Sequence, residues 1–169
     1  MNVKEAILAA LEHEKRVRDH YVWAAEQSKD EKGKHFFEVL AKEEQGHVDY
    51  LESRLAVLKE GKELDAPPLE TLIPSKNWVA EGAQMLKESA EKREYQDDYR
   101  RLFTALKLEE EVSAFYKELV ATLEDPTGKK IFSRFLEIED GHTAIVQAEV
   151  DVMTKTGYFY EFQEFNLEE

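Results

Sequence analysis

Two stretches of the chain repeat 95 residues later with their internal spacing unchanged. Five of twelve positions are identical between residues 10–21 and 105–116, and six of fifteen between residues 33–47 and 128–142. Average amino-acid usage would give roughly two matches over both windows together. The matching pairs that carry ionisable or aromatic side chains are Glu14 and Glu109, Tyr21 and Tyr116, Lys34 and Lys129, Phe37 and Phe132, Glu44 and Glu139, and His47 and His142. Such a repeat indicates duplication, so the chain is expected to fold as two copies of one unit.

Apolar residues recur every three or four positions through most of the chain, which is the period of a helix with one buried face. The interruptions of this pattern predict four long helices, over about 2–27, 31–60, 95–123 and 127–155. Each repeat is then a hairpin of two helices, and residues 61–94 form a long, partly helical crossover between the hairpins. We therefore expect an all-α four-helix bundle of two antiparallel hairpins, in one domain over residues 1–169.

Local signals mark where several of these elements begin and end. Asp30 suits the N-cap of the second helix, Gly61 suits a left-handed residue at its end, and Asp125 or Pro126 suits the start of the last helix. Beyond Ser75 the crossover is expected to form a further helix through Trp78, Met85 and Leu86. Residues 157–169 are rich in aromatic side chains and are expected to pack on the bundle or at a dimer interface.

The spacing of the repeated acidic residues fixes where they lie in the hairpins. Glu14 and Glu44 are equidistant from residue 29 in the first turn, and Glu109 and Glu139 are equidistant from residue 124 beside the second. Residues equidistant from the turn of an antiparallel hairpin lie at the same height, here about 22 Å from the turn. A twofold arrangement of the hairpins would bring six side chains together at mid-bundle: Glu14, Glu44, His47, Glu109, Glu139 and His142.

This set of side chains has the chemistry of a two-metal site. Glu and His at positions i and i+3 lie on one face of a helix, so both can reach one ion. Four carboxylates can neutralise two divalent cations, and mixed carboxylate and imidazole ligation suits iron or manganese. Without cations, buried carboxylates would repel one another at a cost of several kcal/mol per charge. The chain has no Cys, which excludes disulfides, iron–sulfur ligation and thiol catalysis.

Charge and hydropathy restrict the partners and the location of the chain. The formal net charge is −14, so nucleic acid and anionic membranes would be repelled. The mean hydropathy of −0.61 and the lack of a long apolar run predict no membrane span. The first residues lack the pattern of a signal peptide, and a cytoplasmic location is expected.

The paired Glu and Glu-x-x-His hairpins resemble the ferritin-like di-iron carboxylate superfamily, and the rubrerythrin group within it. The resemblance covers nearly the whole chain. It implies that Glu44 and Glu139 bridge two iron ions, with manganese as an alternative, while each remaining Glu and each His binds one ion. It also implies that Tyr21 and Tyr116 form hydrogen bonds close to the centre and support catalysis.

The family resemblance implies an oxidoreductase that reacts with dioxygen or hydrogen peroxide, and three differences qualify this. Typical rubrerythrins carry a Cys-rich module that delivers electrons, so a chain without Cys needs an external electron donor. Val112 stands where they carry an additional carboxylate, which argues against the peroxidase activity of the group. Bacterioferritins have a haem-ligating Met after the second-helix Glu, and Gln45 at this position predicts no haem.

Two other functions remain open at this stage, non-enzymatic iron binding or storage and a purely structural metal bundle. The oligomer is expected to be a homodimer, because the crossover and the aromatic tail add apolar surface. His13, His20 and His35 have no counterpart in the repeat and are expected to pack or face solvent, while Trp23 and Trp78 are expected to be packing residues.

Three residues lie next to the expected ligands in the sequence: Gly46, Gly141 and Glu43. Gly46 and Gly141 each precede a ligand His, and Gly in a helix costs about 1 kcal/mol relative to Ala. Close approach of a neighbouring helix or space for a ligand would explain both. Glu43 is rotated about 100° from Glu44 around the helix, so its replacement is expected to have little effect.

Overall fold

The computed structural model describes residues 1–79, 96–156 and 159, and four long helices make up most of this part of the chain. Helix α1 spans Val3–Gln27, α2 spans Glu31–Lys59, α4 spans Gln96–Thr122 and α5 spans Pro126–Thr156. Each helix begins and ends within one residue of the predicted range. Over the described ranges there is no strand, and the predicted all-α class is confirmed.

The helix ends use the residues that the sequence suggested. The Asp30 side chain accepts a hydrogen bond from the backbone N–H of Gly33 at 2.8 Å, and Asp125 accepts one from Gly128 at 2.6 Å. These two contacts occupy equivalent places in the repeat and satisfy N–H groups that have no partner within the helix. Gly61 has a φ of 69°, the left-handed conformation expected where α2 ends.

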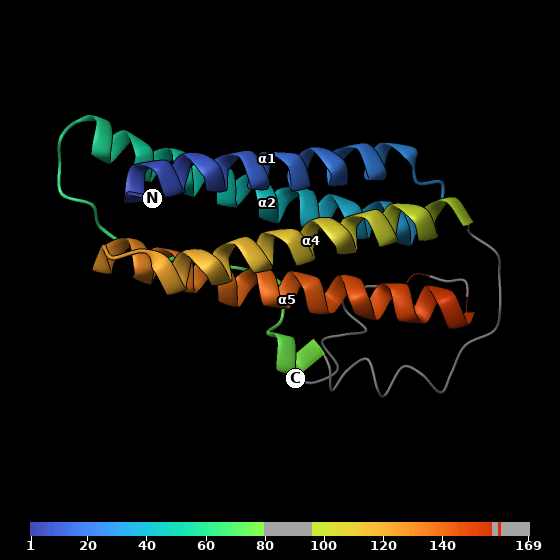
Figure 1. Ribbon diagram of the computed structural model, residues 1–169. Coiled ribbons are helices and arrows are strands. Elements are labelled where there is room, and N and C mark those ends of the chain that lie inside the picture. The colour runs from blue at the N-terminus through green and yellow to red at the C-terminus, as the bar shows by residue number, and fades with distance from the viewer. Residues whose placement is uncertain (80–95, 157–158, 160–169) are drawn as a thin grey trace.

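The four helices form a bundle in which the two hairpins lie side by side (Figure 1). α1 runs antiparallel to α2, α4 runs antiparallel to α5, and α1 also packs against α4. α2 ends at one end of the bundle and α4 begins at the other, so the connection between them must cross its whole length. The bundle therefore has the predicted ferritin-like arrangement with one long crossover.

The first part of the crossover lies between α2 and α5. Its carbonyl groups accept hydrogen bonds from both helices, with 2.8 Å from Tyr50 Oη to Pro67 and 3.0 Å from Arg134 Nε to Leu69. Residues 76–79 are helical, in agreement with a helix after Ser75. The rest of the predicted crossover helix, with Met85 and Leu86, lies outside the described residues.

Aromatic side chains fill the core of the first hairpin near its turn. The Phe36 and Phe37 rings are buried, and that of Phe159 packs against both, at centroid distances of 6.1 and 5.8 Å. Phe159 also covers Gly33, where a β-carbon would come within 2.5 Å of its ring. This residue of the aromatic tail therefore packs on its own chain, and the remaining tail residues lie outside the described part.

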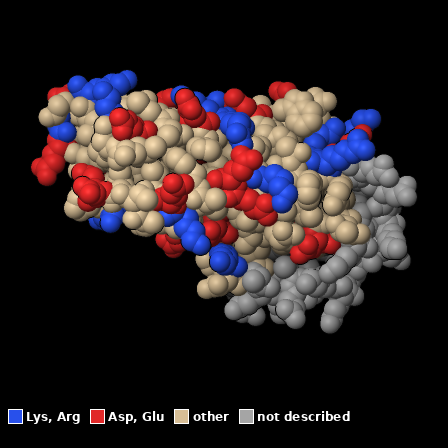
Figure 2. Space-filling view, viewed as in Figure 1, with Lys and Arg blue, Asp and Glu red and all other residues tan. Residues whose placement is uncertain are grey.

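The surface carries both signs of charge. Acidic and basic side chains are interspersed with other residues over the face in Figure 2. In the part of the chain that the structure describes, no helix combines the length and the apolar character needed to cross a membrane.

Candidate metal centre

The structure brings all six expected ligands together in the middle of the bundle. One acidic residue comes from α1, one from α4, and a Glu-x-x-His pair comes from each of α2 and α5. Every one of these residues is at most 1% exposed. The six side chains are those of Glu14, Glu44, His47, Glu109, Glu139 and His142.

Both imidazoles turn Nδ1 toward the carboxylates. His47 Nδ1 lies 3.4 Å from Glu44 and 3.0 Å from Glu139, and His142 Nδ1 lies 2.8 Å from Glu44 and 3.4 Å from Glu139. Glu44 and Glu139, called here the inner pair, thus each contact both histidines. The two rings are stacked, with centroids 5.2 Å apart and planes 7° from parallel. Each of these four residues offers a ligand atom within 4.8 Å of the others, so the group could hold metal ions.

The other two carboxylates each approach one histidine only. Glu14 lies 3.1 Å from His47 Nδ1, and Glu109 lies 3.9 Å from His142 Nδ1. This outer pair, Glu14 and Glu109, therefore flanks the inner pair at opposite ends. The arrangement gives each histidine one carboxylate of its own and two that it shares.

Two buried tyrosines hold the outer pair in place. Tyr21 donates a hydrogen bond to Glu109, and Tyr116 donates one to Glu14. Each tyrosine thus contacts the carboxylate of the other hairpin, and the two contacts are equivalent in the repeat. Burial, together with the carboxylate that each contacts, raises the pKa of both tyrosines well above its usual value, so both hydroxyls remain donors.

Burial and charge give the two pairs of carboxyl groups different pKa values. Burial raises the pKa of both outer carboxyls well above the usual range, and the neighbouring carboxylates add to this effect. Burial also disfavours the charged form of the inner pair, but the two imidazoles outweigh it and hold the pKa of both groups below its usual value. The inner pair is therefore ionised, while the outer pair favours the protonated form.

The histidines complete this charge balance. Burial alone would lower the pKa of His47 and His142, but the inner carboxylates raise both well above the usual value. Two imidazolium ions then face two carboxylates, and protons neutralise the remaining two. Divalent cations would displace these protons, because metal ligands bind in their deprotonated forms.

Several polar atoms of the centre lack a hydrogen bond within the described residues. They are Glu44 Oε2, Glu109 Oε2, both carboxylate oxygens of Glu139, and Nε2 of His47 and His142. Buried polar atoms ordinarily have partners, so unpaired carboxylate oxygens indicate that something else belongs there. A pair of hard cations fits the oxygens, because carboxylates and imidazoles are suitable ligands for iron and manganese.

Glu43 also lies beside the centre, although the sequence did not predict it there. Its carboxylate reaches past the helix surface to lie 3.7 Å from His142 Nε2, on the far side of the ring from Nδ1. It also accepts hydrogen bonds from Thr71 and from the backbone of Leu72, both in the crossover. The expectation that rotation around α2 isolates Glu43 from the centre is wrong. No pattern in the repeat marks this residue, because its counterpart is Ile138.

The repeated glycines differ from each other in their surroundings. A β-carbon on Gly141 would lie 2.9 Å from the carbonyl oxygen of Pro74, so the crossover approaches α5 closely here. A β-carbon on Gly46 would meet no atom within 4 Å among the described residues. Close approach therefore explains Gly141, although a loop makes it rather than a helix. For Gly46 no described residue makes such an approach, and space for a ligand stays a prediction.

The remaining histidines and tryptophans lie away from the centre. His13 contacts the Phe115 ring, with centroids 4.4 Å apart, and His20 Nε2 lies 3.0 Å from the carbonyl oxygen of Arg101. Trp23 is 48% exposed, with the Arg101 guanidinium 5.6 Å from the centre of its ring. Trp78 is also exposed, at 39%, so the expectation that both tryptophans are packing residues is wrong.

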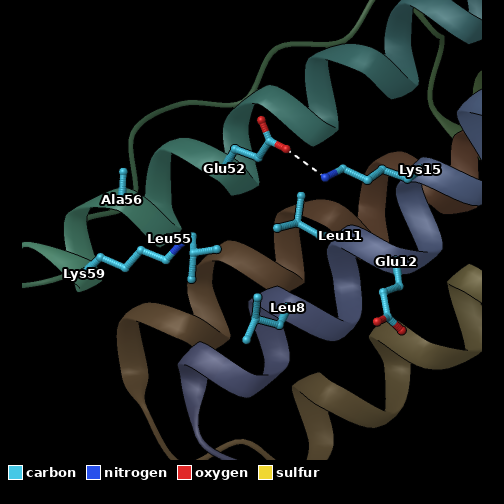
Figure 3. Close-up of a pocket in the computed structure, with 8 residues that line it drawn as sticks. All are labelled: Leu8, Leu11, Glu12, Lys15, Glu52, Leu55, Ala56 and Lys59. Atoms are coloured by element: carbon cyan, nitrogen blue, oxygen red, sulfur yellow. Dashed lines mark ion pairs between the residues drawn. The ribbon is translucent and has the colours of Figure 1, made fainter.

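A pocket on the outer side of the first hairpin is separate from the centre (Figure 3). Leu8 and Leu11 of α1 and Leu55 of α2 supply apolar walls, and an ion pair between Lys15 and Glu52 spans the two helices at 2.8 Å. The pocket contains none of the six clustered residues.

Comparison with known proteins gives one match. Residues 5–151 match the family model described as a ferritin-like domain. No curated protein and no solved structure matches the chain significantly.

Proposed function

The chain belongs to the ferritin-like domain family, and from this premise we propose that it is a di-iron carboxylate oxidoreductase supplied by an external electron donor. The observation that carries the proposal is the buried cluster of four carboxylates and two imidazoles with unpaired oxygen atoms. Two iron ions, or manganese in their place, would supply the redox chemistry with dioxygen or hydrogen peroxide.

The contacts support a division of roles among the six side chains. Glu44 and Glu139 each lie near both histidines, which suits residues that bridge two ions. His47 with Glu14 would hold one ion, and His142 with Glu109 the other. The protein surrounds this set with apolar and aromatic side chains and so excludes water from it.

Tyr21 and Tyr116 position the outer carboxylates. Each hydroxyl fixes one oxygen of its carboxylate; the second oxygen of Glu109 has no hydrogen bond to a described residue, and that of Glu14 faces His47 Nδ1. A carboxylate held in this way is oriented before a metal arrives, which reduces the cost of ordering it on binding.

Metal loading tests the proposal directly. We expect about two ions per chain after anaerobic loading with iron or manganese, measured by elemental analysis. Glu44→Ala and Glu139→Ala should each lose most of this metal and the reaction with oxidants, because each removes a ligand of both ions. Glu110→Ala is the control, since Glu110 is exposed and its ion-pair partner among the described residues is Lys107. One ion or fewer in the unmodified protein would refute the two-metal centre.

Reaction with oxidants separates the enzymatic proposal from iron storage. Val112 is buried at the place where rubrerythrins carry an extra carboxylate, so we expect no strong preference for peroxide. Stopped-flow absorbance after anaerobic loading, with dioxygen and peroxide in separate experiments, measures both rates. Turnover with an added reductant supports an oxidoreductase. Accumulation of many ferric ions per chain without turnover would favour storage instead.

A further inference from the structure

We propose that Glu43 is a positioning residue that fixes the His142 imidazole and makes the two metal positions unequal. The inference rests on the proposed function, since it concerns how the same centre holds its two ions. Glu43 is not among the six clustered residues, and its effect is exerted through His142.

The first step concerns the proton on the far nitrogen of His142. A metal ion bound at Nδ1 leaves the neutral imidazole with its proton on Nε2, which must then find an acceptor. Nε2 is buried and lies 3.7 Å from Oε2 of Glu43. This is an ion-pair distance slightly beyond a hydrogen bond, and a small rotation of the imidazole or carboxylate closes it. Metal-bound histidines ordinarily donate this second N–H to a carboxylate or carbonyl group.

The second step concerns what holds Glu43. Its side chain is only 9% exposed. Thr71 Oγ1 donates to one carboxylate oxygen at 2.5 Å, and the backbone N–H of Leu72 donates to the other at 3.0 Å. The two hydrogen bonds from the crossover therefore fix the Glu43 carboxylate beside the His142 imidazole.

The third step concerns the second hairpin, which has no carboxylate at the position equivalent to Glu43. The position equivalent to Glu43 is Ile138, which is apolar and 3% exposed. Neither Nε2 atom has a hydrogen bond to a described residue, but the described carboxylates within 4.0 Å of His47 all belong to the six clustered residues, and the Phe135 ring lies edge-on to the His47 imidazole at a centroid distance of 5.2 Å. At Nδ1 the two histidines thus share the inner carboxylates, and at Nε2 His142 faces a carboxylate whereas His47 lies beside an aromatic ring.

A carboxylate behind a ligand imidazole raises its basicity and fixes its orientation, and losing such a partner typically costs about 10- to 100-fold in metal affinity. The ion on His142 should therefore bind more tightly than the ion on His47. The duplicated chain would then fill its centre in a defined order, with the His142 position first.

Titration of the metal-free protein with Co(II), followed by calorimetry, tests this order. The unmodified protein should bind two ions in two distinguishable steps. Glu43→Ile gives the first hairpin the residue that the second hairpin carries at the equivalent position, Ile138. This change should weaken the tighter binding step about 10- to 100-fold, so that the two steps become similar in affinity. Glu43→Gln retains an acceptor for Thr71 and should fall between these two results. Ile138→Glu tests the converse by strengthening the weaker step.

Thr71→Val distinguishes two roles of Glu43, its contact with His142 and its hydrogen bond to the crossover. It removes one hydrogen bond to Glu43 and leaves the carboxylate facing the imidazole, so it should retain two unequal steps. Proton NMR of the Co(II) protein adds a readout that a structural role would not change. The exchangeable Nε2 proton of His142 should exchange slowly with water in the unmodified protein and faster in Glu43→Ile.

Three outcomes would overturn the inference. Unchanged affinities and proton exchange in Glu43→Ile and Glu43→Gln would remove Glu43 from the centre while leaving two-metal binding intact. An equal loss in Thr71→Val would assign the effect to the crossover instead of His142. Failure of the unmodified protein to bind Co(II) would overturn the proposed function together with the inference.

Discussion

At the scale of single residues, the centre is held by contacts that cross between the hairpins. Tyr21 of the first hairpin serves Glu109 of the second, and Tyr116 of the second serves Glu14 of the first. Neither hairpin can complete its own set of hydrogen bonds. The ligand geometry therefore depends on the docking of the two repeats as well as on each helix.

Tyr21→Phe and Tyr116→Phe test the strength of these contacts. Each change leaves a buried carboxyl group without its donor, so each should lower the free energy of unfolding of the metal-free protein by about 1–3 kcal/mol. Urea denaturation measures the loss. Tyr50→Phe is the control, because within the described part of the chain that half-buried hydroxyl donates to the carbonyl of Pro67, and its loss should cost about 0.5–1.5 kcal/mol. A loss in the two core variants no larger than in Tyr50→Phe would contradict the cross-hairpin role.

The pKa shifts predict how the metal-free protein responds to pH. The pKa values of the histidines and of the outer carboxyls are raised, so the stability they contribute is lost as pH rises through these raised values. The pKa values of the inner carboxyls are lowered, so their contribution is lost as pH falls below the usual carboxyl range. Between the ordinary carboxyl and histidine values the folded cluster holds more protons than the unfolded chain, so the metal-free protein should be most stable near the ordinary carboxyl pKa, at about pH 4–5, and should lose stability as pH rises from there.

Thermal unfolding of chelator-treated protein from pH 4 to pH 9 measures this dependence. Metal-loaded protein provides the comparison and should gain stability from mildly acidic to neutral pH, because ions compete with protons for the same ligands. A metal-free melting temperature that rises steadily to pH 9 would show that protons do not neutralise the cluster.

At the scale of helices and loops, the sequence predicts the features that occur in both copies of the repeat. Helix bounds and the meeting of the six side chains follow from periodicity and from spacing around two turns, because the register of an antiparallel hairpin is set by its turn. The crossover has no second copy and little periodicity. Its contacts with Glu43 and Gly141 depend on the path of a loop between α2 and α5, which no local pattern specifies.

The paired glycines provide a test at this scale. Gly46→Ala should raise the free energy of unfolding by up to about 1 kcal/mol, because Ala favours the helix and its β-carbon meets no described atom. Gly141→Ala gains the same helical preference but places a β-carbon 2.9 Å from the Pro74 carbonyl oxygen, so the loop must move and the protein should be less stable. Urea denaturation of both variants gives the comparison. Equal stabilisation by both changes would mean that the crossover can move away from residue 141 without loss of stability.

At the scale of the whole molecule, two similar hairpins enclose a centre that one crossover makes asymmetric. Glu43 and Pro74 bring this connection to the His142 side. The repeat places equivalent side chains in both hairpins. The crossover occurs once, and its contacts with Glu43 make the surroundings of His142 differ from those of His47. One chain thus places its two buried imidazoles among similar carboxylates but in unequal surroundings.

The size of the assembly is the last prediction. We expect a homodimer, because large apolar side chains remain partly exposed on both α1 and α4, among them Leu8 at 45%, Trp23 at 48% and Phe103 at 44%. A net charge of −14 opposes association at low salt, so the dimer should strengthen as salt screens this repulsion. Light scattering coupled to size-exclusion chromatography, at low and at physiological salt, gives the mass directly. A monomer at both salt concentrations would contradict the prediction. A particle of many chains would instead indicate a shell and favour iron storage, because only a closed assembly can enclose a mineral core.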